Sequence, residues 1–106
     1  MANTYVNAKV DLTATSVTTL YTCAALTTGI VKSILVSNDS ASADTITLTL
    51  TTGSTVFSLF KVKAVAANTT IELLTAPLVV QASEILKVTA ATANRLHVVA
   101  SILELT

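Results

Sequence analysis

Charged side chains are scarce in this sequence. Lysine and arginine together number six, aspartate and glutamate also six, and the charged residues make up 11% of 106 positions, against about 25% in an average globular protein. The basic residues do not gather into a face that could neutralise phosphates, so we expect neither nucleic-acid nor anionic-membrane binding. Charge repulsion cannot keep such a chain soluble, and we expect other polar groups or partner subunits to cover its surface.

Residues that commonly build catalytic sites are equally few. His97 is the only histidine, and its neighbours by strand alternation are Arg95 and Val99, so no carboxylate on its own strand orients it. We therefore interpret it as a surface or interface residue rather than a general base or a pH sensor. Cys23, the only cysteine, lies in the apolar stretch LYTCAAL and is interpreted as a small buried hydrophobe, with a reactive thiol as the alternative.

Metal and phosphate sites also lack their usual signals. No Cys/His spacing indicates a metal, and the two glycines, Gly29 and Gly53, do not open a helix as a phosphate loop would. Asp39 and Asp44 flank the sequence SASA, but their spacing matches no calcium loop, and turn capping by Asn38 and Asp39 is the favoured interpretation. We predict no enzyme, no cofactor and no metal.

Threonine, in contrast, is abundant, at 20 of 106 residues. In DTITLTLTT, residues 44–52, threonines alternate with Ile46, Leu48 and Leu50. Because strand side chains point alternately to opposite faces, this strand has one apolar face and one face made only of threonine. A threonine face can meet water or lie against another protein without the desolvation cost of buried charges, which suits a small building block at high local density.

The whole chain shows strand patterns separated by turn signals every eight to twelve residues, the spacing of a sandwich or barrel. We predict one domain over residues 1–106, with an all-β fold: a single antiparallel β-sandwich, jelly-roll-like or Ig-like, of about eight to nine short strands. A small closed barrel is the alternative, and 61–68 is the best rival helical segment. The predicted strands are 5–12, 17–23, 30–37, 45–52, 55–65, 69–74, 78–81, 84–90 and 95–105.

Two of these strands have two apolar faces. In 95–105, we predict that Leu96, Val98, Ala100 and Ile102 form the core face. In 56–63, regular alternation places Val56, Phe60 and Val62 on one side and Phe57, Leu59, Lys61 and Lys63 on the other. An apolar patch with a charged rim is typical of an association site, so we propose Phe57, Leu59, Lys61 and Lys63 as subunit-contact residues. A bulge that buries both aromatics is the equally weighted alternative.

From about residue 17 onward the chain resembles small virion proteins of tailed bacteriophages, especially those of phages that infect marine bacteria and cyanobacteria. The shared features are a strand ending in VSN, a short polar turn, an alternating strand, the sequence IELL, the turn QASEILKVTA and the closing strand LHVVASILE. Where these families often carry a Gly-Asp pair in the QASE turn, this chain has Ser83-Glu84.

The resemblance implies a non-enzymatic β-sandwich structural protein and carries over no catalytic residues. We expect a capsid decoration or cement protein that stabilises the phage head by binding between shell subunits, with the major capsid protein as partner and self-association into a homo-oligomer. The N-terminal stretch lacks signal-peptide features, so we expect synthesis in the host cytoplasm and residence in the virion. A neck or tail ring or adaptor is the first alternative, and a carbohydrate-binding β-sandwich module the second.

Overall fold

The structure, a computed structural model, describes residues 3–106, so residues 1–2 of the predicted domain lie outside the described residues. Nine strands are present, and each matches a predicted one with small shifts at the ends. They are β1 (Asn3–Asp11), β2 (Thr18–Thr22), β3 (Thr28–Asn38), β4 (Asp44–Thr52), β5 (Thr55–Val65), β6 (Thr69–Glu72), β7 (Leu78–Val80), β8 (Ile85–Ala90) and β9 (Leu96–Leu105). The rival helix at 61–68 does not form, because β5 continues to Val65 and a turn follows.

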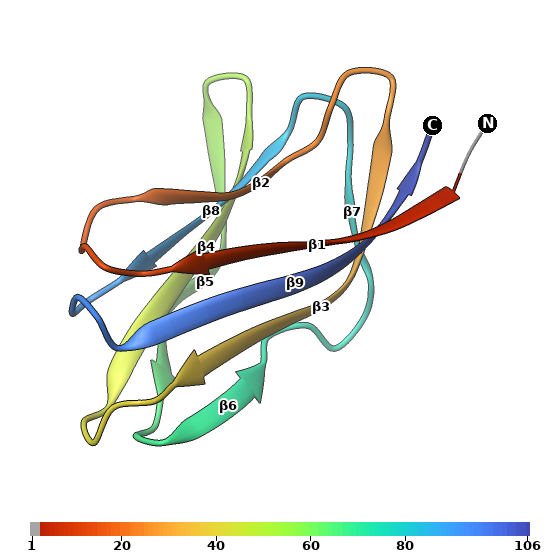
Figure 1. The fold of residues 1–106 in the computed structure, drawn as a ribbon. Coiled ribbons are helices and arrows are strands. Elements are labelled where there is room, and N and C mark those ends of the chain that lie inside the picture. The colour runs from red at the N-terminus through yellow and green to blue at the C-terminus, as the bar shows by residue number, and fades with distance from the viewer. Residues whose placement is uncertain (1–2) are drawn as a thin grey trace.

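The strands form two antiparallel sheets packed face to face, which confirms the predicted β-sandwich (Figure 1). One sheet has the order β1-β9-β3-β6, with β7 also paired to β3, and the other has the order β2-β8-β4-β5. The first strand pairs with the last, the second with the next to last, β3 with β6 and β7, and β4 with β5. This nested pairing is the jelly-roll arrangement.

The core lies between the two sheets and is built from period-two alternation. Each predicted core residue of the last strand is at most 1% exposed, as are Ile46 and Leu48 of β4. The predicted core face of the last strand is therefore confirmed, and the apolar face of the DTITLTLTT strand points inward. Leu12, directly after β1, also belongs to the core and is 1% exposed. Residues 3–106 include no helix long and apolar enough to span a membrane.

Tyr21 ties the two sheets together. Its ring comes from β2, yet its hydroxyl donates a hydrogen bond of 2.5 Å to Oε2 of Glu104 on β9 in the opposite sheet. The ring lies against Gly29 of β3, where an added Cβ would approach the Tyr21 Oη to 2.9 Å. A side chain at position 29 would therefore displace this ring. Burial, and then the bond to Glu104, raise the pKa of Tyr21 well above its ordinary value.

Carboxylates hold two irregular segments of the sandwich. Glu72, at the end of β6, accepts hydrogen bonds from the Ser33 hydroxyl, from Ile34 N at 2.7 Å and from Leu74 N at 3.2 Å, next to the place where β3 shifts register against β9. Burial acts to raise the pKa of Glu72, but these three hydrogen bonds outweigh it and hold that pKa below its ordinary value. Glu84 accepts from Gln81 N at 2.7 Å and from Thr52 Oγ1 at 2.6 Å, which joins the β7–β8 turn to the β4–β5 hairpin.

Candidate subunit-contact surface

Strand β5, which carries the four predicted contact residues, is an edge strand with two interruptions. It pairs only with β4, and the register shifts between Ile46 and Leu48 and again between Leu48 and Thr49. Phe57 lies opposite Leu50, and Phe60 lies opposite Leu48. Because directly opposite residues share a face, both aromatics face the core side although they are three positions apart. The regular alternation predicted for 56–63 is therefore wrong, and β-bulges are the reason.

The threonine face holds one of these bulges in place. Thr47 Oγ1 accepts a hydrogen bond of 3.1 Å from the main-chain N of Val62. Val62 has a φ of 54°, which is uncommon for a β-branched residue. The bulge turns the Val62 amide away from the ladder, and the threonine hydroxyl replaces the carbonyl it would otherwise meet. The sequence gives no signal for this bulge, because a positive φ is usual for glycine or asparagine and not for valine.

The two aromatics of β5 differ in burial. Phe60 packs against the core, as both interpretations predict. Phe57, although it lies on the core side of β5, stays 51% exposed, and Leu59 is 36% exposed. Val56 and Val62 add 60% and 59% exposure on the same strand. Their contact role stays a prediction, but the exposed apolar surface on β5 is present.

A groove extends this surface toward the other sheet. Leu59 and Phe60 form one wall, and residues 73–77, the connection between β6 and β7, form the other together with Leu78 at the start of β7. The groove has a volume of about 360 Å³ and its lining is almost wholly aliphatic or aromatic, with Thr75 the one polar side chain. Lys61 and Lys63 follow on β5 and are both exposed. The result is an apolar strip with cationic side chains at one end.

The outer face of the β2-β8-β4-β5 sheet is rich in threonine on three of its four strands. Cross-strand pairing places threonines of β2, β4 and β8 side by side, and Lys87 is the only charged residue among the paired positions of these three strands on that face. The threonines are Thr19, Thr22, Thr45, Thr47, Thr49, Thr51 and Thr89. Thr45, Thr47 and Thr49 are half-buried by their neighbours, and Thr51 is 8% exposed. Thr51 Oγ1 is buried, with no hydrogen-bond partner among the described residues.

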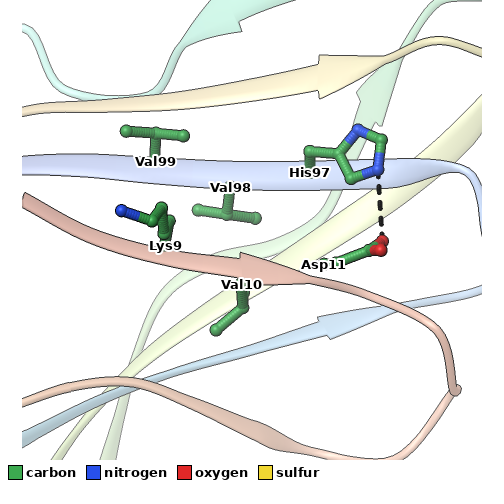
Figure 2. A pocket seen from close by; sticks show the side chains of 6 residues that line it. All are labelled: Lys9, Val10, Asp11, His97, Val98 and Val99. Atoms are coloured by element: carbon green, nitrogen blue, oxygen red, sulfur yellow. Dashed lines mark ion pairs between the residues drawn. The ribbon is translucent and has the colours of Figure 1, made fainter.

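His97 has acidic neighbours that its own strand does not reveal. Figure 2 shows its ring on β9 turned toward Asp11 on β1, with 3.1 Å between Nε2 and Asp11 Oδ1. Nδ1 lies 3.8 Å from Oδ2 of Asp39. The cross-strand row Asp11–His97–Ser37 contains the residue types of a hydrolytic triad, but a general-base histidine keeps one ring nitrogen on its nucleophile. Here both nitrogens face carboxylates, so this row does not pair a base with a nucleophile.

The acidic turn after β3 is organised by an asparagine, as predicted for Asn38. Its Nδ2 donates to Ser42 O at 2.9 Å and to Val65 O at 3.2 Å, and its Oδ1 accepts from Ser40 N at 3.0 Å. Asp39 differs from its predicted capping role, because its side chain faces His97. Asp44 is 6% exposed and accepts from Thr92 N at 3.1 Å. Within residues 3–106, no group of three His, Cys, Asp or Glu side chains is placed to hold a metal ion.

Cys23 is buried, which confirms the predicted environment. It is 1% exposed, and its Sγ donates to the carbonyl oxygen of Thr27 at 3.3 Å. The surrounding main chain joins β2 to the β7–β8 turn, through Cys23 N to Glu84 O and Ser83 N to Cys23 O. The thiol therefore serves packing at this end of the sandwich.

The fold and the surface define a small jelly-roll sandwich with an exposed apolar edge strand. Comparison with protein-family models, with curated proteins and with solved structures finds no match for this chain.

Proposed function

We propose that this protein is a non-enzymatic structural subunit of a tailed-phage virion that decorates the head and cements neighbouring shell subunits. The phage assignment comes from the sequence resemblance. The assembly role comes from one observation above all: seven threonines on the outer face of β2, β4 and β8, with Lys87 as the one charged residue at the paired positions of these three strands on that face. Jelly rolls occur in viral shell proteins and in lectins, so the fold is compatible with the role but does not select it.

Physical chemistry favours such a face in a crowded shell. Burying a charge against a neighbour costs several kcal/mol (about 3–5) when the charge is left unpaired, whereas threonine presents a methyl group and a hydroxyl that a neighbour or water can satisfy. Threonine also fits the pleated surface because it is β-branched. The face can therefore stay wet in the free protein and lie close to a partner in the particle.

Strand β5 supplies the anchor in this proposal. Interfaces draw most of their binding energy from a few buried aromatic or aliphatic side chains ringed by polar groups. The exposed Phe57 and Leu59, which lines the apolar groove, have that character, and the exposed Lys61 and Lys63 provide the polar rim. We propose that this strip contacts the major capsid protein.

The carbohydrate-binding alternative gains no support from the placement of the four aromatic residues. Tyr21 is 7% exposed and Phe60 packs against the core, while the exposed Tyr5 and Phe57 lie on strands of different sheets. No two exposed aromatics therefore form the stacking platform that sugar sites usually use.

Binding to phage particles assembled without this protein tests the proposal. We expect the wild-type protein to cosediment with the heads, and Phe57→Ser to bind about tenfold or more weakly, as for loss of an aromatic anchor. Val17→Ser is the matched control, because Val17 is 64% exposed but lies before β2, away from β5, and should bind as wild type. Equal binding by Phe57→Ser and wild type would show that β5 does not anchor the protein to the head. Binding confined to tails would favour the neck or tail alternative, and no binding would contradict the virion role.

A further inference from the structure

The sandwich has four edges, and three of them carry devices that prevent pairing with another chain. β2 has five residues and a register shift. β5 has two register shifts, the positive φ of Val62, and two lysines. The third edge is split into β6 and β7, of four and three residues, with Pro77 between them. Short strands, bulges, lysines and proline are the usual means by which proteins protect exposed edges.

β1, the fourth edge, carries one lysine, Lys9, but no bulge, proline or break. It has nine residues, pairs with β9 alone within its sheet, and keeps one register from Asn3 to Asp11. It contains no proline and no residue with positive φ. Its side chains are exposed or half-buried along the whole length. A long, flat, accessible edge of this kind is a template for another strand.

The hydrogen-bonding direction along β1 follows from its end. Leu12 N donates to Leu96 O at 3.1 Å, in the same register as the rest of the β1–β9 pair. Since antiparallel residues alternate in which side their peptide groups face, the even-numbered residues of β1 bond to β9. The peptide groups of Asn3, Tyr5, Asn7, Lys9 and Asp11 therefore face outward. The carbonyl of Asp11 already accepts a hydrogen bond from Thr13 N at 2.9 Å. The last outward-facing group of β1 that can bond to a second strand is therefore the Asp11 N–H.

We propose that β1 pairs antiparallel with β1 of a second copy of this chain, across a two-fold axis at Asn7. In this register the two strands overlap along their whole length. The odd-numbered residues of one copy, whose peptide groups face outward, lie opposite the odd-numbered residues of the other, so the two strands can exchange hydrogen bonds. Asn7 then meets Asn7 of the second copy, Tyr5 meets Lys9, and Asn3 meets Asp11. The two five-stranded sheets become one continuous sheet, with the same surface used by both subunits, as a two-fold dimer requires.

Side chains select both the partner and the register. Within one subunit, Lys9 Nζ donates to Asn7 Oδ1 at 3.2 Å, and Asp11 Oδ1 faces His97. In the dimer, the Asn7 amide N–H groups can donate across the axis, the Lys9 stem can lie against Tyr5 of the second copy, and Asn3 can donate to Asp11 Oδ2. A two-fold axis at Lys9 would instead place two lysines opposite each other, which is destabilising. On the inner face, Val6 meets Ala8, and both are half-buried at the open rim of the core. Pairing covers this rim.

This dimer is a property of the isolated chain and holds whether or not the protein decorates a phage head. Sedimentation of the purified protein at micromolar concentration is therefore its first test, without particles. We expect wild type to sediment as a dimer. Asn7→Pro should be monomeric, because proline removes the outward N–H and is tolerated on a free strand edge. Asn7→Ala keeps that N–H and should remain a dimer.

Cysteine cross-linking tests the register even where the proline variant fails to fold. Opposite hydrogen-bonded residues have Cα atoms about 5.5 Å apart, within the range of a disulfide, so oxidised Asn7→Cys should form a covalent dimer. Asn3→Cys is the control, because its two copies would lie about 27 Å apart at 3.4 Å per residue. Wild type should not cross-link, since Cys23 is buried. A monomeric wild type, a dimer unaffected by Asn7→Pro, or equal cross-linking of both cysteine variants would overturn the proposal.

Discussion

Three threonines on one face of β4 allow the same substitution to be made in three different environments. Valine keeps the shape of threonine and removes only its hydroxyl. Thr47 uses that hydroxyl to accept from Val62 N at 3.1 Å. Thr51 buries its hydroxyl without a partner among the described residues. Thr49, half-buried between them, makes no side-chain hydrogen bond among the described residues and serves as the matched control.

The expected changes in unfolding free energy differ in sign. A hydrogen bond contributes about 0.5–1.5 kcal/mol net to stability. Because Val62 is 59% exposed, water can partly replace the lost hydroxyl as acceptor for its N–H. Thr47→Val should therefore lower the unfolding free energy by about 1 kcal/mol. Burying an unpaired hydroxyl costs about 1–3 kcal/mol, so Thr51→Val should stabilise the protein by about 1 kcal/mol. Thr49→Val should change stability by about 0.5 kcal/mol or less. Thr47→Ser keeps the acceptor and should also stay within about 0.5 kcal/mol.

Urea denaturation measures these differences directly. With an m-value of about 1–2 kcal/mol/M for a chain of this size, the midpoints of Thr47→Val and Thr51→Val should lie about 1–2 M apart, with unchanged m-values. Equal losses for the valine variants at 47 and 49 would show that the hydroxyl does not hold the bulge. Destabilisation by Thr51→Val would show that its hydroxyl has a partner.

Two further predictions concern a contact between the sheets and a carboxylate that holds β6 against β3. Gly29→Ala should destabilise the protein by about 1–3 kcal/mol in the same assay, because its Cβ would displace the Tyr21 ring; an unchanged midpoint would refute the close contact. The lowered pKa of Glu72 should make stability fall with acid. In the unfolded chain this carboxyl titrates near its ordinary 4.5, so its contribution is complete above that pH and is lost as the pH falls through the lower folded pKa. Glu72→Gln should therefore flatten the stability profile below about pH 4.5, and an unaltered profile would contradict the assignment.

The fold was accessible from sequence because strands and turns are encoded locally. Alternation of Ile46 and Leu48 with threonine fixed which face of β4 is buried, and the polar turn at Asn38 marked the end of β3. The bulges of β5 could not be located from the sequence, because they depend on Val62 adopting a φ of 54° and on a hydroxyl from another strand. A single sequence shows spacing along one strand but not the neighbour across the ladder.

The same limit explains what was missed around His97. Its acidic neighbours, Asp11 and Asp39, come from β1 and from the turn after β3, and only the jelly-roll pairing brings them together. The unprotected edge at β1 was also hidden, since a strand becomes an edge through sheet order. Its only local signal was an uninterrupted alternating stretch without proline or glycine.

Immunogold labelling of intact phage particles tests the proposed role most directly. Antibody raised against this protein should decorate the heads of the phage that encodes it, in many copies per particle, with no label on tails. Label restricted to the neck or tail would indicate a ring or adaptor protein instead. Particles that carry no label, with the protein found only in the lysate, would contradict the account of this chain as a virion subunit.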